Sequence, residues 1–353
     1  MLSDGSGRLE GLVKAPLPLA RLQPGELELA VEATGLNFRD VLNALGLLHS
    51  HNQSLGLRAN AQLPFGGEAV GRVVAVGPGV DSSLVGQRML AALTLGSLAS
   101  HVSCRAALCV PWPEELDPVL GASLSTAYLT AEHGLEQLAQ LQAGETVLIH
   151  AAAGGVGQAA VQVALRCGAR ILATASEAKQ AGLLEQGVEA VFDSRSTDFG
   201  EQVLKHTEGR GVDVVLNSLK GEWVDASFQA LASGGRFVEL GKLEIWSDHQ
   251  VRERRPDVGY FRFDLLEVAA RDPQPLRQRL LRLVAAAQDQ TLPALPVSAF
   301  ALEQCKDAFR RMAQGKHVGK LVITLPSQAP PCAIRMDGTY LVVGAFGGIG
   351  QRL

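Results

Sequence analysis

The chain has 353 residues, of which 47% are hydrophobic and 19% charged, and its formal net charge is −4. This composition is typical of a folded protein of about two domains and excludes a disordered chain. The acidic balance predicts no nucleic-acid partner. No apolar run of about 18 residues is free of polar interruption, and the N-terminus lacks signal-peptide features, so no membrane is expected. Five cysteines without a C-x-x-C pair suit a reducing, cytoplasmic location.

The first third of the chain predicts a β-rich unit. Alternation of polar and apolar residues, or an excess of valine, indicates strands at 26–33, 69–76, 87–92 and 100–104. One helix interrupts them at 38–45, and Asn37 is its expected N-cap. Residues 49–63 are polar and are interpreted as an excursion before the next strand.

After about residue 117 the sequence period changes to a regular alternation of strands and helices. A long helix is expected over 120–138. The strands that follow are predicted at 146–150, 170–174, 190–193, 212–217 and 236–240. The helices between them are predicted at 156–167, 178–185, 198–207 and 226–231. This order predicts a parallel, doubly wound sheet.

The last part of the chain returns to mixed elements. A single helix is expected over 269–287, followed by strand character near 293–300, a helix at 307–314 and a strand at 320–324. The proline-rich stretch 325–331 predicts a linker. Residues 338–349 combine a strand with a second glycine-rich turn, which we interpret as the truncated start of another domain.

A glycine-rich turn after the strand 146–150 predicts a dinucleotide site. Such a turn lets a pyrophosphate approach the backbone, and the helix it opens offers free N–H groups. Four residues are expected to contact the cofactor there: Gly154, Gly155, Val156 and Gly157. Ala152 replaces the first glycine of G-x-G-x-x-G, so an ordinary glycine-rich turn is the alternative.

The end of the second strand indicates which nicotinamide cofactor binds. It carries no acidic residue at its tip, where NAD sites usually place one for the ribose hydroxyls. Ser176, Lys179 and Arg195 lie at or beyond strand ends, and cations there suit a 2′-phosphate. The sequence therefore favours NADPH, with solvated surface charges as the alternative for Lys179 and Arg195.

Several motifs together identify a family. They are GLNFRDVL at 35–42, LPFGGEAVG at 63–71, the glycine turn within 146–157, DVVLNSL at 213–219, GGRFVELGK at 234–242 and HVGK at 317–320. In this order they closely resemble the enoylreductase domain of type I polyketide synthases and animal-type fatty acid synthases. That family belongs to the medium-chain dehydrogenase/reductase superfamily. The resemblance covers about residues 9–324, and the tail at 338–350 resembles the start of a ketoreductase domain.

The resemblance implies an α/β fold in two parts with the active site between them. Residues 1–115 and 289–324 would form a GroES-like β-rich domain, and residues 116–288 a Rossmann NADPH-binding domain. Residues 325–353 would be a linker and the truncated start of the ketoreductase domain. The implied reaction is NADPH-dependent reduction of an enoyl thioester on acyl carrier protein, which would be a partner together with the ketoreductase domain.

A metal site is not expected. Zinc alcohol dehydrogenases carry a cysteine near the position of Asn37 and a histidine near that of Gly67. Both ligands are absent here, as is the four-cysteine structural lobe, and zinc needs three or four ligands.

The resemblance also assigns roles to single residues. Lys242 matches the lysine proposed as proton donor, and Asp264 its acidic partner, which would orient the lysine or relay a proton. A surface lysine and a helix N-cap are the alternatives. Further cofactor contacts are implied for Asn37, Thr126, Asn217, Ser218, Leu240 and Gly241. Substrate contacts are implied for Phe38, Arg39 and Leu48.

One departure from the family concerns α-protonation. Many modular enoylreductases carry a tyrosine where this chain has Leu48, so Lys242 or water remains as proton donor. Three alternatives to enoyl reduction stay open: cyclopropane formation from a halogenated enoyl thioester, a non-catalytic structural domain, and a free-standing quinone oxidoreductase.

Overall fold

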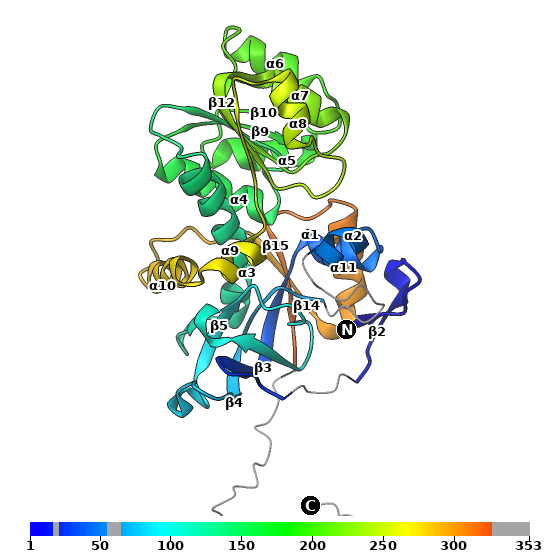
Figure 1. Ribbon diagram of the computed structural model, residues 1–353, viewed down its shortest axis with the longest axis vertical. Helices are drawn as coiled ribbons and strands as arrows, with labels where there is room; N and C mark the ends of the chain where they lie inside the picture. Colours follow the sequence, from blue (N-terminus) through cyan, green and yellow to red (C-terminus); the bar gives the residue numbers. More distant parts are fainter. Residues whose placement is uncertain (17–20, 55–64, 327–353) are drawn as a thin grey trace, which may run out of the picture.

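The computed structural model describes residues 1–16, 21–54 and 65–326. Figure 1 shows two parts stacked along the long axis, each built on its own β-sheet. Most of the expected polar excursion, the linker from residue 327 and the predicted start of a ketoreductase domain lie outside the described residues. The expected fold class, a GroES-like unit plus a Rossmann sheet, is confirmed.

The lower part in Figure 1 is a seven-stranded sheet that joins both ends of the described chain. Its strands run in the order β14 (Val297–Ala301), β15 (Lys320–Thr324), β3 (Glu26–Leu36), β4 (Glu68–Val76), β5 (Arg88–Ala92) and β7 (Cys109–Pro111), with β6 (His101–Arg105) also paired to β3. β15 pairs antiparallel with β3, with Leu321 opposite Leu36. The C-terminal return segment therefore completes the N-terminal sheet.

The upper part is a six-stranded sheet whose pairings are all parallel. Its order is β10 (Ala190–Asp193), β9 (Arg170–Ala175), β8 (Thr146–Ile149), β11 (Val212–Asn217), β12 (Leu231–Glu239) and β13 (Gly259–Arg262). The connecting helices are α4 (Gly155–Arg166), α5 (Glu177–Glu185), α6 (Phe199–His206) and α7 (Glu222–Ala230). The order in which successive strands are added reverses between β8 and β11, and doubly wound sheets bind ligands at this kind of position.

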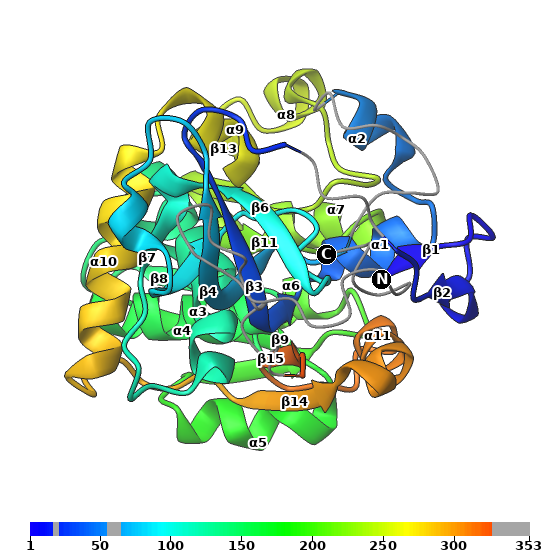
Figure 2. The same ribbon diagram turned by 90° about the horizontal axis from the view of Figure 1, so that it is seen from below.

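Two predicted helices differ in the structure. The helix expected over 120–138 is α3 (Pro118–Glu132), which continues as a π-helical segment at His133–Leu138. The helix expected over 269–287 is two helices, α9 (Leu265–Arg271) and α10 (Gln274–Gln288). Pro273 lies between them, and proline lacks the N–H that a continuous helix needs. Figure 2 shows α10 and α11 (Cys305–Ala313) on opposite sides of the molecule.

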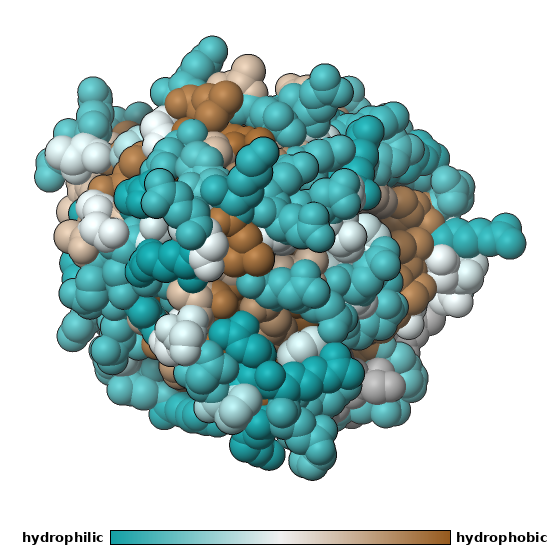
Figure 3. Space-filling model, turned by 90° about the horizontal axis from the view of Figure 1, so that it is seen from above, coloured by the Kyte–Doolittle hydropathy of each residue, from teal (hydrophilic) through white to brown (hydrophobic). Residues whose placement is uncertain are grey.

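Other short elements were missed by pattern alone. They are β1 (Leu2–Ser3), β2 (Leu12–Val13), α2 (His49–Ser54), α8 (Asp248–Arg254) and β13. α1 covers Phe38–Ala44, and Asn37 occupies its N-cap position as expected, with its N–H bonded to Asp40 Oδ2 at 2.9 Å. No helix within the described ranges is both long and apolar enough to span a bilayer. The face seen in Figure 3 is mostly hydrophilic.

Candidate active site

The glycine turn lies at the carboxyl end of β8 and opens α4. Its left-handed residue is Ala151, with φ of 48°, rather than Ala152. A Cβ on Gly157 would meet both the Ala151 carbonyl oxygen and Ala152 Cα at 2.5 Å, so only glycine fits there. The turn therefore packs closely against the N-terminus of α4, and the free N–H groups of a helix N-terminus can bind an anion.

A buried ion pair packs against this turn through Lys320. Lys320 Nζ donates to Leu36 O at 2.9 Å, to Asn37 Oδ1 at 2.8 Å and to Glu68 Oε1 at 2.7 Å. The other Glu68 oxygen accepts from Ser125 Oγ at 2.7 Å and from the Thr126 N–H at 2.8 Å. These bonds join β15, β3, β4 and α3 at one point, which we call the Glu68–Lys320 pair.

Electrostatics favour the charged form of this pair. Burial raises the pKa of Glu68, but the Lys320 ammonium and the hydrogen bonds more than offset it, so the pKa lies below its usual value. An ammonium has three donors, and all three are used here.

These residues do not fit a metal ion. Asn37, at the position of a zinc-ligating cysteine, donates its amide Nδ2 to Glu68 at 3.1 Å and accepts from Lys320. Among the described residues no group of three or more histidine, cysteine or acidic side chains could hold a metal. The cation among these oxygens is the Lys320 ammonium itself.

The segment 315–320 packs against the glycine turn. Gly319 N–H donates to Ala153 O at 2.8 Å, and a Cβ on Gly155 would meet Lys320 Cδ at 2.5 Å. Lys179, which was predicted to contact a 2′-phosphate, donates to Gly315 O at 2.5 Å and to His317 O at 2.6 Å. Of the other residues predicted for that phosphate, Ser176 is half-buried at the N-cap of α5 and Arg195 is exposed.

A second group of charges bridges the two parts of the molecule. Lys242 Nζ donates to Phe263 O at 2.6 Å and lies 3.8 Å from Asp264 Oδ2. Arg39, from α1 in the lower part, forms an ion pair with the same Asp264 oxygen at 3.2 Å and donates to Asn52 Oδ1 at 3.1 Å. Asp264 Oδ1 also accepts the Leu266 N–H at 2.9 Å, so this residue caps α9 while it faces Lys242.

The surroundings of Lys242 make its ammonium more acidic. Burial lowers its pKa, the Asp264 carboxylate raises it, and the positive Arg39 lowers it again, with a net decrease. The Lys242 side chain is 25% exposed, so its proton can be exchanged with the surroundings. A half-buried lysine of reduced pKa is the chemistry required of a general acid near neutral pH.

The other predicted residues differ in their setting. Thr126 Oγ1 and Arg39 Nε are buried and have no hydrogen-bond partner among the described residues. Asn217 is fully buried at the end of β11, whereas Ser218 is exposed. Phe38 is 56% exposed.

Three further predicted residues lie at the edges of this region. Leu240 and Gly241 are half-buried after β12, and the Leu240 N–H donates to Asn217 O at 2.8 Å. Leu48, in place of the family's tyrosine, is buried.

One histidine is structural, as expected. His150 Nδ1 lies 3.0 Å from Thr174 Oγ1 and its Nε2 lies 2.8 Å from Ser227 Oγ. Burial lowers the pKa of His150 to about 3, so the ring is neutral at physiological pH.

Sequence reasoning assigned no role to Glu68, Lys320, Asn52 or Glu239, although motifs containing three of them were recognised. Glu68 and Lys320 are 252 positions apart, and nothing local indicates their pairing. The available signal was a carboxylate within the predicted strand for Glu239 and directly before one for Glu68, since buried positions seldom hold carboxylates.

Two family models match the chain. The alcohol dehydrogenase GroES-like domain matches residues 23–114, and the zinc-binding dehydrogenase family matches residues 186–323. One of the subunits of the phenolphthiocerol/phthiocerol polyketide synthase of Mycobacterium tuberculosis is 43% identical over 98% of this chain. The chain spans only 16% of that relative's length.

Solved structures of related proteins also match the chain over nearly its whole length. The CurK enoyl reductase is 43% identical, with a TM-score of 0.85 over 92% of this chain and 98% of that one. The CurF enoyl reductase cyclopropanase of the curacin A pathway is 39% identical, with a TM-score of 0.83 over the same shares. Mycobacterial Rv1454c, solved in complex with NADPH, is 28% identical, with a TM-score of 0.79 over 91% of this chain and 98% of that one.

Proposed function

Because this chain belongs to the enoyl reductase domains of polyketide synthases, within the medium-chain dehydrogenase/reductases, we propose that it reduces an enoyl thioester with NADPH. The observation that carries this proposal is the group formed by Lys242, Asp264 and Arg39 at the junction of the two parts. It offers a proton and positive charge next to the edge of the sheet where a dinucleotide binds.

In the proposed reaction, the β-carbon of the enoyl group accepts a hydride, which a reduced nicotinamide would supply when bound. The C=C electron pair moves to the thioester oxygen, and a proton must then reach the α-carbon. Lys242 is the donor we propose, because its ammonium is half-buried and its pKa is lowered. Asp264 holds that ammonium in place, and Lys242 regains a proton from solvent.

For the cofactor, we propose that Thr126 and Asn37 face the nicotinamide and that the turn 154–157 holds the pyrophosphate. Thr126 Oγ1 is a buried hydroxyl without a partner among the described residues, which supports this. NADPH is preferred over NADH in the proposal because the tip of β9 ends in Ala175 and Ser176 rather than in an acidic residue, and Lys179 lies nearby. The NADPH complex of Rv1454c supports the choice by analogy.

Partners and boundaries are part of the proposal. We propose that acyl carrier protein delivers the thioester and that residues 325–353 lead into a ketoreductase domain, as the multidomain relatives suggest. The division we propose is 1–115 and 289–324 for the substrate domain and 116–288 for the NADPH-binding domain.

The test is NADPH oxidation with crotonyl-pantetheine or crotonyl-carrier protein, run beside NADH and a Lys242→Ala variant. Turnover with NADPH, little with NADH and loss in the variant are expected. Failure to bind NADPH would support a non-catalytic domain. Turnover of a quinone but not of the thioester would support a quinone oxidoreductase.

Cyclopropane formation is the second candidate, favoured by the similarity to the CurF cyclopropanase. The same hydride addition would generate an enolate, whose α-carbon then displaces halide from the γ-carbon and closes the ring. A γ-chlorinated enoyl thioester distinguishes the two. Stoichiometric chloride release with a ring product would favour cyclopropane formation, and a saturated chlorinated product would favour simple reduction.

A further inference from the structure

A buried carboxylate outside the proposed reaction occupies the end of strand β12. Glu239 is 1% exposed and lies in register with Asn217 of β11 and with Arg262 of β13. Its Oε2 accepts Asn217 Nδ2 at 2.8 Å, and its Oε1 accepts the Gly241 N–H at 2.6 Å. One bond leads to Asn217, for which the family resemblance implies a cofactor contact, and the other to the turn before Lys242, the proposed proton donor.

The orientation of the Asn217 amide is fixed from a second direction. Its Oδ1 accepts the Leu219 N–H at 3.1 Å, so its Nδ2 must face Glu239 and Leu219 O. On the other side, a Cβ on Gly241 would meet Glu239 Oε1 at 2.7 Å and Ile245 Cγ2 at 3.0 Å. The carboxylate therefore contacts N–H donors on both of its oxygens and leaves no room for a side chain at position 241.

We propose that Glu239 is a positioning residue that, in its ionised form, fixes Asn217 and the turn leading to Lys242 in the arrangement that binds the cofactor. The proposal rests on the proposed function for the identity of that cofactor. A carboxylate satisfies both N–H groups, whereas an amide in its place would turn an NH₂ toward one of them. A buried donor without an acceptor is costly, so the turn would shift.

The charges around Glu239 bear on its ionisation. Lys242 follows in the same turn, Arg262 lies opposite on β13, and Tyr260 is on the same strand as Arg262. Burial raises the pKa of Glu239 to about 7, although the hydrogen bonds from Asn217 and Gly241, with Lys242 and Arg262, oppose that rise. Titration of this group therefore falls in the range where the enzyme would work.

The experiment uses the 353-residue chain and NADPH itself, with affinity measured by nicotinamide fluorescence between pH 5.5 and 8.5. For the wild type, affinity should increase with pH through about 7. For Glu239→Gln, affinity at pH 8 should fall about tenfold, by ~1.4 kcal/mol, and the step near pH 7 should vanish. A wild-type profile in the variant would overturn the proposal.

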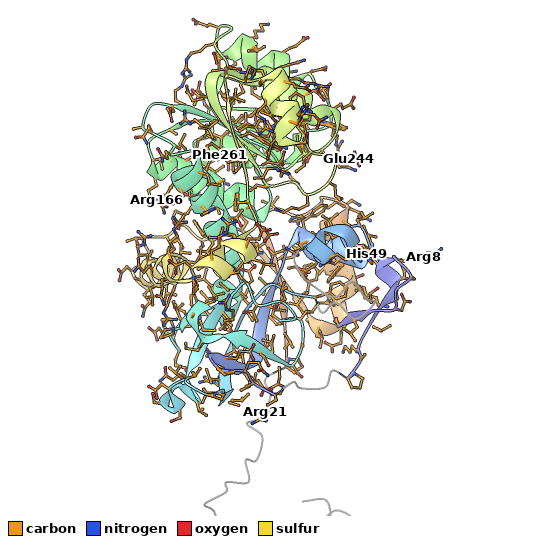
Figure 4. The ribbon with its side chains drawn as sticks, in the orientation of Figure 1. Arg8, Arg21, His49, Arg166, Glu244 and Phe261 are labelled. Atoms are coloured by element: carbon orange, nitrogen blue, oxygen red, sulfur yellow. The ribbon has the colours of Figure 1, made fainter. Side chains whose placement is uncertain are left out.

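The matched control is Glu244→Gln. Glu244 lies in the loop that follows β12. Its side chain is 62% exposed and, among the described residues, pairs only with Lys220, whose side chain is 59% exposed. Figure 4 labels Glu244 on the outer side of this loop. This control removes one negative charge without touching the buried contacts, so it should keep both the affinity and the step; loss of the step here as well would overturn the assignment to Glu239.

A double variant keeps the proposal testable if Glu239→Gln fails to fold. In Asn217→Asp/Glu239→Gln the new carboxylate can accept the glutamine NH₂, while the glutamine oxygen accepts the Gly241 N–H. Thermal unfolding should then recover in part relative to the single variant, because Leu219 O still loses its Asn217 donor, and absence of any recovery would contradict the positioning role. These readouts need no enoyl thioester, so they separate this proposal from enoyl reduction. If the wild type binds no NADPH, the proposed function fails, and unfolding of the variants still tests the Glu239 contacts.

Discussion

The molecule contains two lysine–carboxylate pairs close to the junction of its sheets, and they are built differently. In the Glu68–Lys320 pair the charged atoms are 2.7 Å apart, and the two side chains are 0% and 4% exposed. Lys242 and Asp264 are 3.8 Å apart, and their side chains are 25% and 8% exposed. All ammonium donors of Lys320 are used, whereas Lys242 has Phe263 O as its hydrogen-bond acceptor among the described residues.

The comparison distinguishes a pair that stabilises the structure from a pair that can take part in the proposed reaction. A buried charge is tolerated only when its partners compensate fully for the lost water, so a saturated pair is rigid and unreactive. A less saturated lysine with reduced pKa retains the capacity to release a proton. The Glu68–Lys320 pair therefore holds Asn37 and Thr126 in place, and Lys242 remains available to act.

The largest expected effect is on turnover in Lys242→Met. Loss of the proposed acid should lower kcat by about 10²–10⁴-fold, while NADPH affinity and unfolding change little because the side chain is partly exposed. Steady-state kinetics with crotonyl-pantetheine measure this. Lys220→Met, at an exposed ion pair, is the control. Unchanged kcat in Lys242→Met would remove this residue from the chemistry.

Lys320→Met should instead act on stability. It leaves the Glu68 charge buried without its partner, which should lower the free energy of unfolding by about 3–5 kcal/mol. Urea denaturation at pH 7 measures this. The double variant Glu68→Leu/Lys320→Met should recover part of the loss, since no unpaired charge remains. If Lys320→Met lowers the free energy of unfolding by less than about 1 kcal/mol, the range of exposed pairs, the Glu68–Lys320 pair does not have the stabilising role that distinguishes it from Lys242 and Asp264.

The pH dependence of the two pairs should also differ. The folded-state pKa of Glu68 is below its ordinary value, so its contribution to stability is present above about 4.5. That contribution is lost as pH falls through the folded-state pKa. For Lys242, activity should instead decline as pH rises above its lowered pKa, because the ammonium loses its proton. Across pH 3–10, the free energy of unfolding should therefore decrease on the acidic side, and kcat should decrease on the alkaline side.

Arg39→Gln should shift the alkaline limb of the pH profile, which is the range in which kcat declines at high pH. Arg39 lowers the pKa of Lys242 by its charge and shares the Asp264 oxygen, so its removal should raise that pKa and shift the limb to higher pH. Arg39→Lys keeps the charge and should keep the limb nearer to that of the wild type. An unshifted limb in Arg39→Gln would show that Arg39 does not act on Lys242.

The smallest effect is expected for a third lysine. Lys179→Ala should weaken NADPH binding about tenfold, by ~1.4 kcal/mol, and NADH binding much less. Lys205, exposed on α6, is the control. Equal weakening of both cofactors would indicate that Lys179 acts through Gly315 and His317, to which it donates, and not on a phosphate.

The sequence was sufficient for elements whose signal is local. Strand alternation predicted β3, an excess of valine predicted β4, and the change of period after residue 117 predicted the parallel sheet with its glycine turn. It failed where a local pattern spans a break, as at Pro273, or where a short strand such as β13 is defined only by its neighbour β12. The hydrophobic periodicity of a segment shows that one of its faces is buried, but it does not show which other segment buries that face.

By itself, the sequence determined the family, the two-part fold and the position of the glycine turn, because these depend on residue order and spacing along the chain. Only the tertiary structure decided that Lys320 pairs with Glu68, that Arg39 reaches Asp264, and that Glu239 holds Asn217. The reason is physical: these charges are stabilised by partners brought together through sheet pairing and packing, and the energy of each depends on burial that no single segment can report.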